Sequence, residues 1–118
     1  MVSEKSFREM ALSFPEVYEQ GHFEKTSFRV GKKIFATLDA SNKQACLKLS
    51  LADQDVFCTY DKTIIFQVPN KWGTLGWTNI NLEKIPKKML LDALSTAYCE
   101  VAPKKLAALI TKPAGKFF

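Results

Sequence analysis

The sequence predicts one α+β domain, in which helices pack on one face of an antiparallel sheet of about five strands. Apolar side chains recur with helical spacing near both ends of the chain, over residues 7–14 and 90–101. Between these ends, apolar and polar residues alternate in short runs that turn residues separate. The expected order of elements along the chain is α-β-β-β-α-β-β-α. This order favours an antiparallel sheet with the helices on one face.

The first helix is expected to begin after Ser3, whose hydroxyl group suits an N-cap. Phe7, Met10 and Phe14 then fall on one helical stripe, and Pro15 ends the helix. Residues 16–25 are expected to form a loop or an irregular edge strand.

Strands over residues 26–30 and 34–39 are expected to form a hairpin. The glycine at position 31 favours a two-residue turn, but that register would scatter apolar side chains over both faces of the sheet. A three-residue loop gives coherent faces, and face coherence is the stronger constraint because a one-residue slip flips every side chain. The predicted pairs are therefore Val30 with Ile34 and Phe28 with Ala36.

Three further strands are expected over residues 45–49, 64–68 and 78–82, where apolar and polar residues again alternate. In the strand over residues 64–68, the even-numbered residues are expected to face the core, and Ile65 and Gln67 to face away from it. The core face of the sheet then receives the helices.

Two further helical segments are expected. Ser50-x-x-Asp53 resembles a capping box, which would open a short helix that runs to about Tyr60. Pro86 suits the first turn of the last long helix. Pro103 is expected to break that helix before a final helical turn or two.

The length of 118 residues fits one domain, expected over residues 1–110, with a tail over residues 111–118. No apolar run approaches the roughly 20 residues that span a bilayer, and the N-terminus has no signal-peptide pattern. The three cysteines, Cys46, Cys58 and Cys99, are widely spaced, and we expect free thiols in a reducing cytoplasm. With His22 as the single histidine, we expect no metal and no cofactor.

The sheet face away from the helices is expected to mix aromatic rings, cations and amides, as a binding surface does. An alternative is that a loop, the tail or a second copy of the chain covers this face. Lysines at the hairpin tip and beside Trp72 are expected to reach phosphates, although lysines at such tips often serve only solubility. The candidate nucleic-acid or ligand-binding residues are Arg29, Lys32, Lys33, Phe35, Lys48, Lys71, Trp72, Trp77 and Asn79, with His22, Ser27 and Lys104 as secondary candidates.

The net charge of +5 lies in the C-terminal third of the chain, because residues 84–118 hold seven lysines and two acidic residues. A basic end attracts phosphate backbones, and a solvated helix face with a soluble tail would have the same composition.

No catalytic constellation is evident, so we do not expect an enzyme. His22 has only Glu19 and Glu24 near it in sequence, and such a histidine is either a general base or a hydrogen-bonded structural residue. The sequence has no P-loop, no G-x-G-x-x-G pattern and no nucleophile elbow.

Four segments, taken in order, resemble the MmcQ/YjbR-like family over about residues 3–110. They are residues 22–38 (HFEKTSFRVGKKIFATL), 47–50 (LKLS), 72–78 (WGTLGWT) and 101–105 (VAPKK). The positions that match the family's motifs are His22, Phe23, Ser27, Arg29, Lys33, Trp72, Gly76, Trp77, Pro103 and Lys104.

The resemblance implies a CyaY-like fold and a small bacterial cytoplasmic protein. Members are commonly labelled DNA-binding through a "double wing" shape, and the resemblance implies no catalytic residue. We therefore expect weak, salt-dependent DNA binding through the basic hairpin tips and the aromatic and cationic sheet face. The alternative is a non-enzymatic module that binds a protein or a small anionic ligand on the same face. Either function is compatible with a monomer or a weak homodimer.

Overall fold

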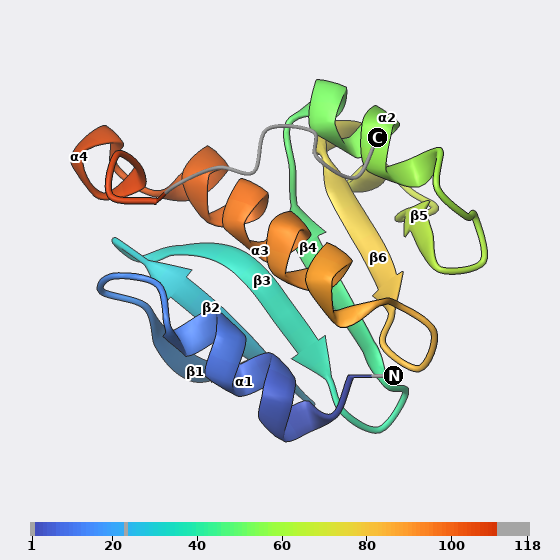
Figure 1. Cartoon of the computed structure of the whole chain (residues 1–118), viewed down its shortest axis with the longest axis horizontal. Helices are drawn as coiled ribbons and strands as arrows, with labels where there is room; N and C mark the ends of the chain where they lie inside the picture. Colours follow the sequence, from blue (N-terminus) through green and yellow to red (C-terminus); the bar gives the residue numbers. More distant parts are fainter. Residues whose placement is uncertain (1, 23, 111–118) are drawn as a thin grey trace.

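The computed structural model describes residues 2–22 and 24–110, and it confirms an α+β fold in two layers (Figure 1). The elements are α1 (Glu4–Leu12), β1 (Tyr18–His22), β2 (Lys25–Val30), β3 (Lys33–Asp39), β4 (Gln44–Lys48), α2 (Leu51–Cys58), β5 (Ile65–Gln67), the 3-10 helix η1 (Gly73–Leu75), β6 (Trp77–Asn81), α3 (Lys87–Val101) and α4 (Lys104–Ala107). The expected tail, residues 111–118, lies outside the described residues.

All strands of the described residues join one antiparallel sheet of six strands, in the order β1-β2-β3-β4-β6-β5. The sequence predicted about five strands, and the additional one is β1. Its residues pair with β2 along its whole length, from Tyr18 opposite Arg29 to His22 opposite Lys25. Because β4 pairs with β6, the earlier strand β5 lies at the sheet edge.

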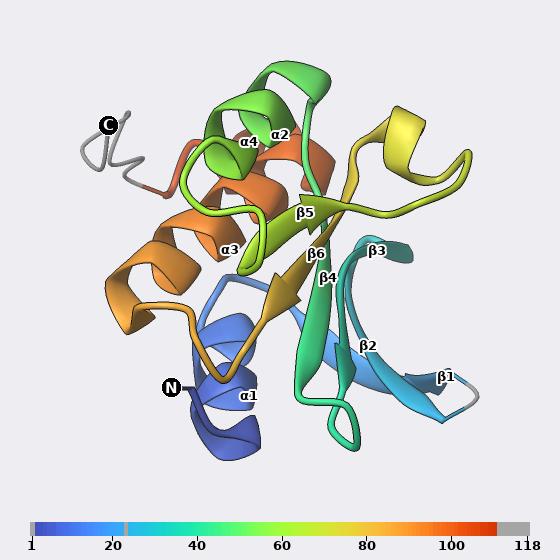
Figure 2. The ribbon, with the colours of Figure 1, turned by 90° about the vertical axis from the view of Figure 1, so that its right-hand side faces the viewer.

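The helices and the open side of the sheet are clearest in Figure 2, where α1 and α3 lie on the same side of the strands. We call the opposite side the open face. Among the described residues no α-helix covers it, and the loop that holds η1 projects at one end of it (Figure 2).

The core lies between α1, α3 and the sheet, and aromatic rings fill its centre. The Phe14 ring stacks on Tyr98 with centroids 5.1 Å apart, and Phe35 meets Tyr98 edge-on at 5.6 Å. The Tyr98 hydroxyl group donates a 2.7 Å hydrogen bond to the Pro15 carbonyl oxygen. This bond ties α3 to the end of the α1 segment, and it satisfies a phenol whose side chain is otherwise buried.

The β2–β3 hairpin corrects part of the predicted register. Gly31 and Lys32 both have positive φ, 57° and 71°, as a two-residue type I′ turn requires. Val30 therefore pairs with Lys33 and Arg29 with Ile34, so the predicted pair of Val30 with Ile34 is wrong. A bulge between these pairs and the next one restores the predicted pairing of Phe28 with Ala36.

The bulge also exchanges two side chains between the faces of the sheet. The extra residue is Phe35, and both Phe35 and Ala36 are fully buried although they are consecutive. The expected position of Phe35 on the open face is therefore wrong, and Ile34 lies there instead, beside Trp77. One extra residue in a strand shifts alternation by one position, which lets both turn chemistry and face coherence be satisfied.

Strand β5 shows a second difference in orientation. Ile65, expected on the open face, is fully buried and pairs with Ile80 of the core, while Phe66 pairs with Asn79. The strand is short, and Ile64 precedes it in a turn where the amides of Ile64 and Ile65 both donate to the Asp61 carbonyl oxygen. Ile64 is also buried, because its direction is set by the turn rather than by the pleat.

The predicted capping box of α2 is confirmed. The Ser50 hydroxyl group accepts from the Asp53 amide at 3.1 Å and donates to the Asp53 carboxylate at 2.9 Å. The break at Pro103 is also confirmed, because α3 ends at Val101 and α4 begins at Lys104. Over the described ranges, no helix has the length and apolar character needed to cross a membrane.

Candidate binding groove on the open sheet face

The antiparallel register places the open-face side chains in rows across the strands. One row runs through Ser27, Thr37, Cys46, Asn79 and Phe66, which are successive pairing partners on five strands. A second row lies two residues further along the strands, and in it Lys48 pairs with Trp77. Side chains of one row lie about 5 Å from their neighbours and therefore act together.

A groove of about 500 Å³ crosses these rows, and we call it the open-face groove. Strands β2, β3, β4 and β6 contribute Lys25, Ile34, Thr37, Gln44, Cys46, Trp77 and Asn79. The loop between β5 and η1 contributes Val68, Asn70 and Trp72. The volume of the open-face groove lies in the range of sites that bind small ligands, roughly 300–1,000 Å³.

The loop that carries Trp72, residues 68–76, is closed by a set of hydrogen bonds, and we call it the tryptophan loop. Trp72 donates its amide to the Asn70 side-chain oxygen at 2.9 Å, and Val68 donates its amide to the Trp77 carbonyl oxygen at 3.2 Å. The Trp77 amide in turn donates to the Trp72 carbonyl oxygen at 3.1 Å. The backbone on both sides of Trp72 is therefore fixed.

Two glycines let this loop pack closely against its neighbours. A Cβ at Gly73 would lie 1.9 Å from the Val68 carbonyl oxygen, and a Cβ at Gly76 would lie 1.9 Å from the Leu49 carbonyl oxygen. Gly76 also has a φ of 109°, which L-residues with a side chain rarely adopt. Both glycines are thus required by the path of the loop.

Gln54 of α2 holds the same loop from the other side. Its side chain is buried, and its amide nitrogen lies 2.9 Å from the Gly73 carbonyl oxygen and 3.1 Å from the Trp77 carbonyl oxygen. The hydroxyl oxygen of Thr78 is a third partner at 3.2 Å. The short helix α2 therefore positions the tryptophan loop, a role that no sequence pattern indicated.

On this rigid loop, Trp72 remains 52% exposed. The Lys71 ammonium group lies 5.9 Å from the centroid of its ring, within the range of a cation–π contact. Trp77 is half-buried on β6 and lines the same groove. An exposed tryptophan on a fixed backbone is unusual for a surface without a partner, because large apolar side chains are costly to leave wet.

Lys25 is a groove residue that the sequence did not indicate. Its charge helps to lower the pKa of Asp39, although hydrogen bonding from the Asn42 side chain is the larger cause. Lys25, Ser27 and Arg29 alternate along β2, so the open face could have been extended to Lys25 if β2 had been predicted to begin one residue earlier.

Cys46 lies in the floor of the groove with a protonated thiol. Burial raises its pKa to about 11, and the nearby Lys25 charge only partly opposes this shift. A thiol of this kind is a poor nucleophile at neutral pH. The described residues, moreover, contain no group of three or more histidine, cysteine or acidic side chains that could hold a metal ion.

The other predicted site residues divide into three groups. Trp72, Trp77 and Asn79 meet in the groove. Lys32 and Lys33 are exposed at the tip of the β2–β3 hairpin, and Lys71 is exposed beside Trp72. In the third group, Arg29 and Lys48 contact other parts of the protein.

Arg29 donates from Nε to the Ser27 hydroxyl group at 3.0 Å, and that hydroxyl group donates to the Gln20 carbonyl oxygen at 2.9 Å. Lys48 lies outside the groove, because its Nζ is 3.3 Å from the Leu49 carbonyl oxygen and 4.0 Å from a Glu100 carboxylate oxygen. Its ammonium group is therefore directed at the Leu49 and Glu100 oxygens and not into the groove.

The secondary candidate Lys104 lies away from the groove. Lys104 is exposed at the beginning of α4, which packs against α3 rather than against the open face. For His22 the structure describes the backbone, which pairs with Lys25 at the end of β1. Phe23 lies outside the described residues.

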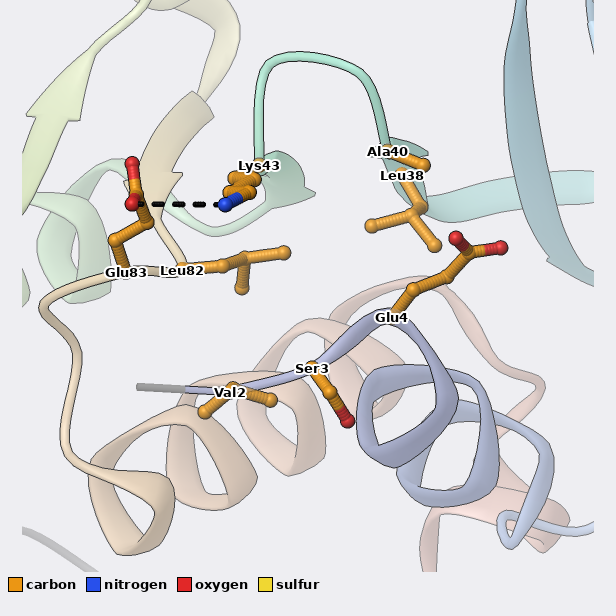
Figure 3. A pocket seen from close by; sticks show the side chains of 8 residues that line it. All are labelled: Val2, Ser3, Glu4, Leu38, Ala40, Lys43, Leu82 and Glu83. Carbon is orange, nitrogen blue, oxygen red and sulfur yellow. Dashed lines mark ion pairs between the residues drawn. The ribbon is translucent and has the colours of Figure 1, made fainter.

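A smaller cavity of about 260 Å³ lies near the beginning of α1, between Val2, Leu38 and Leu82 (Figure 3). At its rim the Lys43 ammonium group lies 3.8 Å from a Glu83 carboxylate oxygen. Figure 3 shows no aromatic ring among the side chains that line it. This cavity therefore has less of the chemistry of a recognition site than the open-face groove has.

Comparisons with known proteins bear on the family. A search of curated proteins gives no significant match. The crystal structure of Deinococcus radiodurans protein DR2400, described as a DUF419 domain, is similar in fold, with a TM-score of 0.77 and 20% sequence identity. The match covers 98% of this chain and 94% of that chain. The model of the YjbR family matches residues 12–100, so the chain belongs to the YjbR family.

Proposed function

We propose that this YjbR-family protein is a cytoplasmic, non-enzymatic protein that binds DNA weakly through the open-face groove and its two basic loop tips. The observation that carries the proposal is Trp72, an exposed ring held on a rigid loop at the side of a groove. Rings presented in this way stack on bases, and lysines beside them contact phosphates.

The basic loop tips support the proposal. The hairpin tip presents Lys32 and Lys33, and the tryptophan loop presents Lys71. Both loops lie at the same end of the sheet, because Ile34, next to the hairpin tip, lines the groove together with Trp77. Two tips of this kind agree with the double-wing shape, and the protein would contact DNA as a monomer or a weak homodimer.

Fluorescence anisotropy with a labelled oligonucleotide at several salt concentrations tests the proposal. Neutralising the tips in Lys32→Gln/Lys33→Gln/Lys71→Gln should weaken binding and reduce the slope of log K against log [salt] by up to about 0.7–0.9 for each lysine that no longer neutralises a phosphate. The control Lys5→Gln/Lys87→Gln/Lys88→Gln removes the same net charge from exposed lysines of the helical layer. Equal weakening by both triple variants, or no binding at tens of micromolar in low salt, would overturn the proposal.

A second candidate is a module that binds a small anionic ligand, which the groove volume of about 500 Å³ favours. In that case Lys25 would contact the anion and Trp77 would contact the apolar part of the ligand. The lysine-tip variant would then bind normally, while Trp77→Phe would weaken binding.

A further inference from the structure

We propose that the part of the nucleic acid bound in the open-face groove is an unpaired base of a single strand, and not a base pair of a duplex. This inference rests on the proposed function and names the form of nucleic acid that the groove selects. Three independent features of the groove lead to this inference: the ring of Trp72, the side-chain amide groups and the distribution of cations.

A base that stacks on Trp72 must present an accessible face to the ring. In a duplex, each base is stacked between its neighbours and presents only its edges in the grooves. Trp72 can therefore stack on a base only when the base has left the helix. Because the loop is held by Gln54, Gly73 and Gly76, the backbone that carries the ring is already ordered before binding, and little backbone entropy is lost when a base stacks on it.

The amide groups of the groove suit an unpaired base. Gln44 and Asn79 come from adjacent strands, and Asn70 comes from the tryptophan loop. Side-chain amides carry both donors and acceptors, as does the Watson–Crick edge of a base. That edge is occupied by the partner base in a duplex and becomes available only in a single strand.

The cations are placed for a short strand that runs along the groove. Lys25 lies at the level of Gln44 and Asn81 at one end, Trp72 lines the other end, and the Lys71 ammonium group lies 5.9 Å from the Trp72 ring. Asn81 and Trp77 are four residues apart on β6, and β2 lies three strands from β6, so the two ends are separated by about 13 Å along the strands and about 14 Å across them. A backbone that crosses this distance can contact one lysine at each end while its base lies against Trp72.

A duplex reader would carry more arginine on this face. The chain has two arginines. Arg8 lies on the helical side, 3.1 Å from Glu19 and 3.6 Å from Glu4, and Arg29 uses its Nε on Ser27. Arginine paired bidentately with guanine is the commonest specific contact to duplex DNA, and neither arginine of this chain lines the groove.

The test compares a labelled 12-nucleotide single strand with the blunt duplex of the same sequence, by anisotropy at low salt. We expect the single strand to bind at least about ten-fold more tightly than the duplex. Trp72→Ala should weaken single-strand binding by about 5- to 150-fold, which is the effect of removing one stacked base–aromatic pair. Trp72→Phe should retain most of the affinity, and neither change should affect the duplex.

Tyr60→Ala is the matched control, because Tyr60 is 45% exposed and lies outside the groove. A second readout uses Trp77→Phe, in which Trp72 is the only tryptophan of the chain, and the single strand should quench its fluorescence while the duplex should not. Circular dichroism confirms that each variant is folded.

The outcomes separate the inference from the proposed function. A duplex that binds as tightly as the single strand, or single-strand binding that Trp72→Ala leaves unchanged, would overturn the inference and leave DNA binding intact. A mononucleotide that binds as tightly as the 12-mer would overturn it in favour of a small-ligand site. If neither single strand nor duplex binds, both the inference and the proposed function are overturned.

Discussion

Gly76 shows how a single residue determines whether the tryptophan loop can form. Its carbonyl oxygen accepts from the Leu49 amide at 3.0 Å, and its α-carbon faces the Leu49 carbonyl oxygen with no room for a methyl group. The loop is therefore pressed against the residue that follows β4, and this contact fixes the backbone at the end of the loop.

At this scale we predict that Gly76→Ala lowers the free energy of unfolding by at least about 2 kcal/mol, from the combined positive φ and steric clash. Gly21→Ala is the control, because no atom lies within 4 Å of the Cβ that it would add. Its effect should stay within about 1 kcal/mol and should favour the folded state. Urea unfolding of both variants measures the difference, and equal effects would contradict the prediction.

At the scale of elements, α2 acts as a support for the tryptophan loop more than as a cover for the core. Of its eight residues, Gln54 and Phe57 are buried, while Leu51 and Val56 remain exposed. The polar contacts of Gln54 join this helix to η1 and β6. Without them, the loop would retain its local turns but would no longer be joined to α2.

We predict that Gln54→Met, which keeps the length of the side chain and removes its donors, costs about 1–3 kcal/mol in the free energy of unfolding. It should also increase hydrogen exchange at the amides of residues 72–77. The control is Gln20→Met, at an exposed position of the edge strand β1. Unchanged exchange in the loop, despite a drop in stability, would show that Gln54 does not position it.

The elements also show what periodicity could and could not predict. Alternation located β2, β3, β4, β5 and β6, because one face of each strand packs on a core. Strand β1 was missed as a regular element, since Tyr-Glu-Gln-Gly-His has no apolar alternation and pairs on one edge only. The bulge at Phe35 was missed for another reason: the turn and the core each favour a different register, and periodicity allows only one.

The candidate site was predictable to the extent that it depends on neighbours in sequence. Trp72, Trp77 and Asn79 fall near one another in the chain and do meet in the groove. The contact of Lys48 with Glu100 was not predictable, because the two residues are distant in sequence and no pattern connects them. Gln54 was missed because a buried glutamine has no local signature in a helix.

For the whole molecule, the sheet order makes the two halves of the chain depend on each other. The pairing of β4 with β6 joins the N-terminal strands to the C-terminal ones. The Val2 amide donates to the Leu82 carbonyl oxygen at 2.8 Å, and Tyr98 reaches Pro15 across 83 positions of sequence. Such contacts connect the beginning of the chain to its last third, so neither half has a complete core of its own.

We therefore predict one cooperative unfolding transition. Far-UV circular dichroism follows the helices, and tryptophan fluorescence follows Trp72 in the tryptophan loop and Trp77 on strand β6. The midpoints of the two urea transitions should coincide. A tryptophan transition at clearly lower urea than the melting of the helices would show that the region of β6 and the tryptophan loop unfolds first.

Cys46 gives the groove a built-in chemical reporter. Any molecule that fills the groove covers the thiol in its floor, and so slows alkylation of Cys46 without an added label. The high pKa keeps the background reaction slow at neutral pH, so labelling should become roughly ten-fold faster for each pH unit up to about 11. Occupancy of the groove can thus be followed in the unmodified protein, whatever the ligand proves to be.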